Sequence, residues 1–231
     1  MKRLFLSFGV VLALLAACSQ QPASEEETAE KNQEPRKVYA KWDNRVYKDK
    51  DLKEIVAVLS KCESVTKLGE EEVTVSSGSN EETFTVYHIK LADGVEAYAK
   101  ENLFALKTIV FTADSTDCFV RPTMDSRLYY KIPLGTLGFI TEEGDDGWVK
   151  IWIGKVDDGV KEKWVTDQWV QAGYSDEIEL IRDAKLYEKA LETLDKNPEE
   201  GIAALKEINE NSATFFARLA SENIPDNTSV E

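Results

Sequence analysis

Hydrophobic residues follow four successive patterns along this 231-residue chain. The first is an apolar run, Leu4–Ala17, preceded by Lys2 and Arg3. A basic start, an apolar segment of this length and small residues at its end are typical of a secretory signal peptide. The run is shorter than the roughly 20 apolar residues that a membrane-spanning helix needs. We therefore predict that residues 1–17 are removed as a signal peptide and that the mature chain is exported.

The second pattern is a polar tract from Ser19 to Lys37 that contains no large apolar residue. Such a segment cannot bury enough surface to offset the entropy that it would lose on ordering. We expect residues 18–37 to form a disordered tether that separates the folded part from the membrane.

The third pattern, from residue 38 to about 171, consists of short apolar runs separated by turn residues. Short strands with evenly spaced turns predict one small β-barrel or a pair of them. The same order of strands and turns recurs with a period of about 65 residues, which favours a repeat. The expected strands are residues 38–40, 45–47, 55–59, 83–91, 111–113, 118–122, 129–135, 137–141, 147–153 and 163–170.

The fourth pattern has helical periodicity and covers residues 175–223. Apolar side chains spaced alternately by four and three residues predict one buried helix face. Ser175 is the expected cap of this first helix, and Asn197 followed by Pro198 marks the start of a second. A third short helix is expected through Phe215 and Phe216. The fold class is therefore mainly β with a helical C-terminal tail. The first helix face comprises Leu180, Ala184, Tyr187, Leu191 and Leu194.

The end of the apolar run, Leu15-Ala16-Ala17-Cys18, resembles the lipobox of bacterial lipoproteins. The resemblance implies that Cys18 becomes the mature N-terminus and carries a thioether-linked diacylglycerol, with an added acyl chain such as palmitate. Two or three acyl chains hold a protein on a membrane much better than one, since each buried CH₂ contributes about 0.8 kcal/mol. Ser19 differs from the Asp that retains lipoproteins at the inner membrane, so the resemblance favours the outer membrane.

The repeat resembles the bacterial SH3 domain family, which implies two small SH3-like β-barrels in tandem, residues 38–106 and 107–172. The first copy is degenerate, because it lacks the Arg-Pro pair and has Ala97-Tyr98-Ala99 where the family has Gly-Trp-Val. The second copy departs from the family where Lys163 replaces a glycine. Its matching motifs are Val120-Arg121-Pro122, Ile132-Pro133-Leu134-Gly135, Gly147-Trp148-Val149-Lys150-Ile151 and Lys163-Trp164-Val165.

Charge narrows the range of partners. The chain has 43 acidic and 28 basic residues, a formal net charge of −15, and the signal peptide holds two of the basic residues. Nucleic acids and anionic lipid surfaces attract basic patches, so neither is an expected partner. The membrane contact is instead expected through the lipid on Cys18, and no other cofactor is predicted.

Catalytic and metal-binding chemistry are not predicted. The chain has a single histidine, His88, in the middle of an expected strand, so a Cys-His nucleophile is not favoured. Acidic pairs at Asp145-Asp146 and Asp157-Asp158 fall in expected turns, where Asp is common for backbone reasons, and their spacing is not that of a calcium loop. We expect no catalytic residue, no metal site and no enzyme activity.

Two cysteines remain after lipidation, Cys62 and Cys118. Export permits a disulfide between them, but they fall in different predicted barrels. A disulfide and a pair of small buried thiols both remain open at this point.

Aromatic residues give the candidate ligand site. In residues 147–153, Val149 and its alternate neighbours are expected to face the core, which leaves Trp148 and Trp152 on the other face. Together with Trp164 and Tyr130 they predict either packing against another part of the chain or a groove for a peptide or glycan.

The sequence favours a membrane-anchored, non-enzymatic binding module of the cell envelope. By resemblance to the SH3 family, its ligand is a protein partner or a cell-wall peptide of peptidoglycan. The main alternative is a surface-displayed lipoprotein that binds a host or other extracellular protein, and a third is an accessory subunit of a cell-wall enzyme. Whether the folded part faces the periplasm or the outside is left open.

Overall fold

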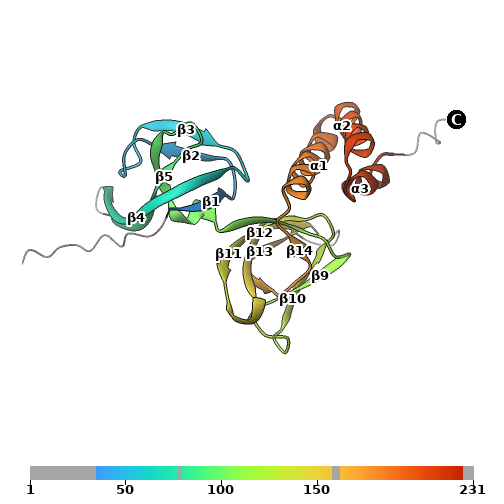
Figure 1. Cartoon of the computed structure of the whole chain (residues 1–231), viewed down its shortest axis with the longest axis horizontal. Helices are drawn as coiled ribbons and strands as arrows, with labels where there is room; N and C mark the ends of the chain where they lie inside the picture. The colour runs from blue at the N-terminus through green and yellow to red at the C-terminus, as the bar shows by residue number, and fades with distance from the viewer. Residues whose placement is uncertain (1–34, 78–79, 158–161, 226–231) are drawn as a thin grey trace, which may run out of the picture. The chain divides into compact units, whose positions relative to one another are not determined.

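The computed structural model describes residues 35–77, 80–157 and 162–225. These ranges contain two seven-stranded antiparallel sheets followed by three α-helices, so the prediction of a mainly β chain with a helical C-terminal tail is confirmed. Figure 1 shows that each sheet is curled on itself. The signal peptide, Cys18 and tether residues up to 34 lie outside the described residues. Arg36 and Lys37, which the sequence placed in the disordered tether, instead begin β1 (Arg36–Ala40), where they pair with Lys67 and Thr66 of β4 (Ser64–Ser77).

The first sheet pairs its strands in the order β3-β2-β6-β5-β4-β1-β7. A short 3₁₀ turn, η1 (Glu101–Leu103), lies before its last strand. The strands are β1 (Arg36–Ala40), β2 (Asn44–Tyr47), β3 (Ile55–Leu59), β4 (Ser64–Ser77), β5 (Asn80–Lys90), β6 (Glu96–Lys100) and β7 (Phe104–Ala105).

The second sheet repeats this order seven strands later, as β10-β9-β13-β12-β11-β8-β14. The internal repeat in the sequence therefore has a counterpart in strand order, while its identity as a pair of SH3-like barrels stays a prediction. A 3₁₀ turn, η2 (Asp145–Gly147), precedes β12. The strands are β8 (Lys107–Phe111), β9 (Ser115–Phe119), β10 (Leu128–Pro133), β11 (Leu137–Glu143), β12 (Val149–Asp157), β13 (Glu162–Val170) and β14 (Tyr174–Ser175).

Among the strands that the sequence did not predict, which also include β6, β7 and β14, β4 is the longest, and it is the longest described strand. It pairs with β5 from Thr66 to Ser77 and with β1 over its first residues. The run Glu70-Glu71-Glu72 interrupts any apolar alternation there, so the local pattern carries no strand signal. Pairing with neighbours on both sides, a tertiary effect, decides its conformation.

Each sheet encloses a core of its own. The first is built around fully buried aliphatic side chains such as Val46 and Ile89, and the second around Phe111, Ile132 and Ile151. Burying such side chains contributes about 1.5–3 kcal/mol each. The curled sheets therefore have the apolar interiors that the alternating sequence pattern predicts.

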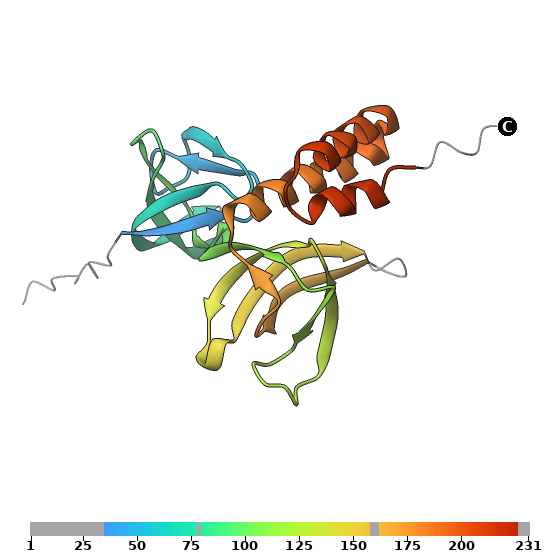
Figure 2. The ribbon, with the colours of Figure 1, turned by 45° about the vertical axis from the view of Figure 1, so that its right-hand side comes forward.

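The three helices follow β14. They are α1 (Ile178–Lys196), α2 (Pro198–Asn211) and α3 (Phe216–Glu222). Asn197 caps α2 as predicted, because its Oδ1 accepts the Glu200 N–H at 3.5 Å and Pro198 occupies the first turn. Ser175, however, is the last residue of β14, and Glu177 takes the N-cap position of α1 without a side-chain cap. Figure 2 shows α1 and α2 side by side.

A third core holds the helices together. It contains Leu205 and Phe216 from the helices, with Val110 and Leu137 from the second sheet. Among the described residues, none of the helices combines the length and apolar character required to cross a bilayer.

Candidate docking groove

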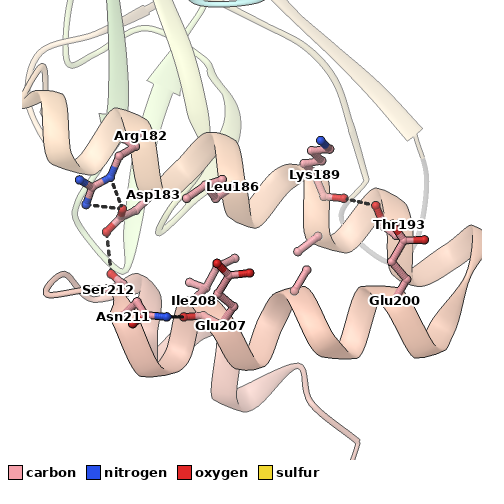
Figure 3. A pocket seen from close by; sticks show the side chains of 12 residues that line it. Arg182, Asp183, Leu186, Lys189, Thr193, Glu200, Glu207, Ile208, Asn211 and Ser212 are labelled. Atoms are coloured by element: carbon pink, nitrogen blue, oxygen red, sulfur yellow. Dashed lines mark hydrogen bonds and ion pairs between the residues drawn. The ribbon is translucent and has the colours of Figure 1, made fainter.

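An open groove of about 460 Å³ runs along the junction between α1 and α2. Its floor is apolar, and Leu186 on α1 is the main exposed apolar side chain in it, with 50% of its surface exposed. Figure 3 shows Leu186, Ile208 and the Glu207 side chain between the two helices, with Arg182, Asp183 and Ser212 toward one end and Lys189, Thr193 and Glu200 toward the other. The lining residues are Arg182, Asp183, Leu186, Lys189, Ala190, Thr193, Glu200, Ala204, Glu207, Ile208, Asn211 and Ser212.

The width of the groove depends on how closely α1 and α2 approach. Gly201, in the first turn of α2, is buried against the backbone of Leu194 near the end of α1. A Cβ at residue 201 would overlap the Leu194 N and Cα atoms. The absence of a side chain at Gly201 therefore permits the close contact that defines one end of the groove.

The other end of the groove is fixed by a buried carboxylate, Asp183, of which 2% is exposed. Its Oδ2 accepts hydrogen bonds from the hydroxyls of Ser212 at 2.6 Å and Thr214 at 2.9 Å, and its Oδ1 accepts from Arg182 Nη2 at 2.9 Å. Burial alone would raise the pKa of Asp183, but the bonds from Ser212, Arg182 and Thr214 outweigh it and lower the pKa below its usual value. Asp183 thus ties α1 to the connection between α2 and α3.

We expect Asp183→Asn to destabilise the helical part by about 2 kcal/mol at pH 7, because hydrogen bonds to a charged group contribute roughly 1.5–3 kcal/mol. The pKa of Asp183 is lower in the folded chain than in the unfolded chain. The stability that the ionised Asp183 carboxylate contributes is therefore present above the unfolded pKa and is lost as the pH falls through the folded pKa. Urea titrations followed by circular dichroism at 222 nm should therefore show a wild-type to variant difference that shrinks below pH 3.8, the ordinary value. Asp195→Asn, on an exposed residue of the same helix, is the matched control; an equal loss in both variants would contradict the assignment.

The rims of the groove carry opposite charges. Arg182 and Lys189 stand on the α1 side, and Glu200 and Glu207 stand on the α2 side. All four residues are exposed. The groove therefore combines an apolar floor with one basic and one acidic edge.

The four aromatic residues of the predicted ligand groove do not share an open surface. Trp148 is buried with its ring edge-on to Phe119 at 5.7 Å, and Tyr130 belongs to the core of the second sheet. Trp164 is 60% exposed. Phe119 of β9 covers Trp148, so this residue agrees with the packing alternative and not with an open ligand groove.

Trp152, the fourth of these residues, makes a contact within the chain. Its ring lies 4.5 Å from the ring of Trp42, and Lys41 Nζ lies 5.3 and 5.5 Å from the Trp42 and Trp152 rings. Burial lowers the pKa of Lys41, while Asp167 opposes that shift. These contacts agree with the packing alternative for Trp152.

The other residues that the sequence analysis considered for chemistry, Cys62, Cys118 and His88, do not form a common site. Cys62 and Cys118 are free thiols, and burial raises the pKa of each to about 11, which disfavours the reactive thiolate. His88 Nε2 lies 2.9 Å from Glu96, and its ring stacks on Tyr98. Across the described ranges, no group of three or more His, Cys, Asp or Glu side chains is placed to hold a metal ion.

Comparison with known proteins assigns the chain to the lipoproteins. The profile of the family described as Lipoprotein LenA matches residues 5–229. The chain belongs to this LenA lipoprotein family, which associates it with the cell envelope. No curated protein matches it.

A solved structure of NlpC2 from Trichomonas vaginalis is similar at 12% sequence identity and a TM-score of 0.25. The match covers 70% of this chain and 56% of that one, so the chain spans little more than half of that structure's length. A likeness this weak carries no argument about function.

The α1–α2 groove was not predicted from the sequence. One available signal was Leu186, which lies outside the helix face formed by residues such as Ala184 and Tyr187. A single exposed apolar residue is ordinary on a protein surface, and Leu186 becomes part of a groove only because Ala190, Ala204 and Ile208 lie beside it where the two helices meet. The position of Gly201 opposite Leu194 could not be read from the sequence, because it depends on how the two helices pack.

Proposed function

We propose that this lipoprotein is a membrane-anchored, non-enzymatic binding protein whose groove between α1 and α2 holds a protein partner. The observation that carries the proposal is the apolar floor between two charged rims. Half of the Leu186 surface is exposed there. Apolar surface surrounded by polar residues marks interaction sites in soluble domains.

The anchor in this proposal is Cys18, at the end of the lipobox. Family membership supports a lipoprotein, and the outer membrane is the location that Ser19 favours. A tethered protein meets partners on or near the same surface at high effective concentration, so a shallow groove is sufficient for association.

A non-catalytic role is supported by what surrounds the candidate reactive groups. His88 is engaged by Glu96 and Tyr98, and the thiols of Cys62 and Cys118 have raised pKa values. The described groove contains hydrogen-bonding and apolar groups and no histidine or cysteine. Its chemistry fits recognition better than bond cleavage.

The test is retention of envelope proteins by the purified, full-length lipoprotein in detergent. We expect Leu186→Glu to abolish retention of a discrete protein, because it places a charge on the apolar floor. Leu128→Glu is the matched control, since Leu128 is 42% exposed on the second sheet. Retention that is unchanged in Leu186→Glu, or binding of purified peptidoglycan alone, would contradict the proposal.

A further inference from the structure

We propose that the occupant of the groove is an amphipathic α-helix of the partner protein, with an acidic flank along α1 and a basic flank along α2. This inference rests on the proposed function and specifies the chemistry of the partner. It is carried by the construction of the groove walls, by the small residues on its floor and by the opposite charges on its rims.

The walls exclude an extended peptide as the preferred occupant. Both are formed by residues within or next to α1 and α2, whose backbone groups bond inside the helices. Side chains occupy further backbone acceptors: Thr193 Oγ1 donates to the Lys189 carbonyl at 2.8 Å, and Asn211 Nδ2 donates to the Glu207 carbonyl at 2.9 Å (Figure 3). An extended chain on this apolar floor would leave unpaired those of its N–H and C=O groups that face the floor, whereas a helix satisfies them internally.

The floor has the dimensions that a helix needs. Ala190 and Ala204 are small residues, one from each wall, with the larger Leu186 and Ile208 beside them. Small side chains allow a third helix to approach closely, and larger neighbours interlock with its apolar residues. The α1 wall from Arg182 to Thr193 is about 16 Å long at 1.5 Å per residue, which corresponds to three turns of a docked helix.

The rims determine the charge of the occupant. Among the described residues, the ammonium of Lys189 and the carboxylate of Glu207 have no ion-pair partner in the chain. Arg182 is shared with Asp183, and Glu200 accepts a hydrogen bond from Asn197 Nδ2 at 3.0 Å. A helix with carboxylates toward Lys189 and ammonium groups toward Glu207 complements both edges, and charge of one sign on both flanks would be repelled at one of them.

The net charge of the chain favours a different protein over a second copy. At −15, two copies repel one another, while a helix with balanced flanks does not meet this penalty. Recognition then follows the general helix-in-groove mode, in which apolar anchors at positions i, i+4 and i+7 enter a groove.

The experiment uses synthetic 15-residue amphipathic helices and the full-length lipoprotein in detergent. The three probes share one apolar stripe and carry glutamates on one flank and lysines on the other, lysines on both, or glutamates on both. We expect the mixed probe to bind about tenfold more tightly than the other two at low salt, a difference of about 1.4 kcal/mol. Lys189→Glu should shift the preference to the all-lysine probe, and Lys206→Glu, on α2 outside the groove lining, should not.

Three outcomes would overturn the inference. They are equal binding of all three helices, equal binding of a proline-containing probe that cannot form a helix, and self-association in sedimentation that Leu186→Glu abolishes. The inference and the proposed function fail separately. If Leu186→Glu abolishes retention of an envelope protein but none of the synthetic helices binds, the helical occupant is wrong and the groove remains the binding site. If Leu186→Glu changes no retention and no helix binds, the proposed function and the helical occupant are both wrong.

Discussion

Phe216→Ala is expected to destabilise the helical part by about 3–5 kcal/mol, the usual cost of removing a large buried aromatic side chain. Phe216 is fully buried at the start of α3. Its ring lies 5.5 Å from the Tyr187 ring and 4.7 Å from the Phe215 ring, and a Cβ added at Gly135 would meet its edge. Truncation would leave a cavity in the third core, and the cost depends on how far its neighbours can collapse into it.

Phe215→Ala is the matched control, because the neighbouring phenylalanine is only half-buried. It should cost less than half as much. All five tryptophans precede residue 170, so their fluorescence reports the two sheets, while circular dichroism at 222 nm follows the helices. Equal losses for Phe215→Ala and Phe216→Ala in urea titrations would show that Phe216 is not the centre of the third core.

Gly201→Ala is the second substitution with a large expected effect. We expect it to lower the free energy of unfolding, whereas replacing a helical glycine by alanine usually raises it. Replacing a helical glycine by alanine ordinarily stabilises by about 0.5–1 kcal/mol. At residue 201 the added methyl would overlap the Leu194 backbone, and backbone cannot move aside as a flexible side chain can. Overpacking of this kind costs about 1–3 kcal/mol, so we expect a net loss and a wider separation of α1 and α2.

Ala203→Gly is the control for intrinsic helix preference, because Ala203 is exposed on the same helix. It should lose about 1 kcal/mol through backbone entropy alone. If Gly201→Ala raised the urea midpoint by as much as Ala203→Gly lowered it, the close packing of α1 on α2 would be refuted.

Local signals predicted the helices well. Asn197 and Pro198 marked the start of α2 because capping is decided within a few residues. β4 was missed because Glu70-Glu71-Glu72 interrupts its pattern, while its pairing with β1 and β5 comes from distant parts of the chain.

The candidate site was harder to predict than the fold. The aromatic groove failed at Trp148, since alternation along a strand indicates which side a residue faces and not whether Phe119 of another strand covers that side. The actual groove depends on Gly201 against Leu194 and on Asp183 with Ser212, pairs whose proximity follows from packing. Only Leu186, an apolar residue off the buried helix face, pointed to it locally.

The central claim is that the groove between α1 and α2 is where this lipoprotein meets its partner. The most direct measurement is site-specific photo-crosslinking in cells that carry the full chain, with the photoreactive residue at position 186. Met124, 70% exposed on the connection before β10, is the control position. The account predicts an adduct to one discrete protein, through a helical segment, from position 186 and none from position 124. The same adduct from both positions, or an adduct only to a second copy of the chain, would contradict it.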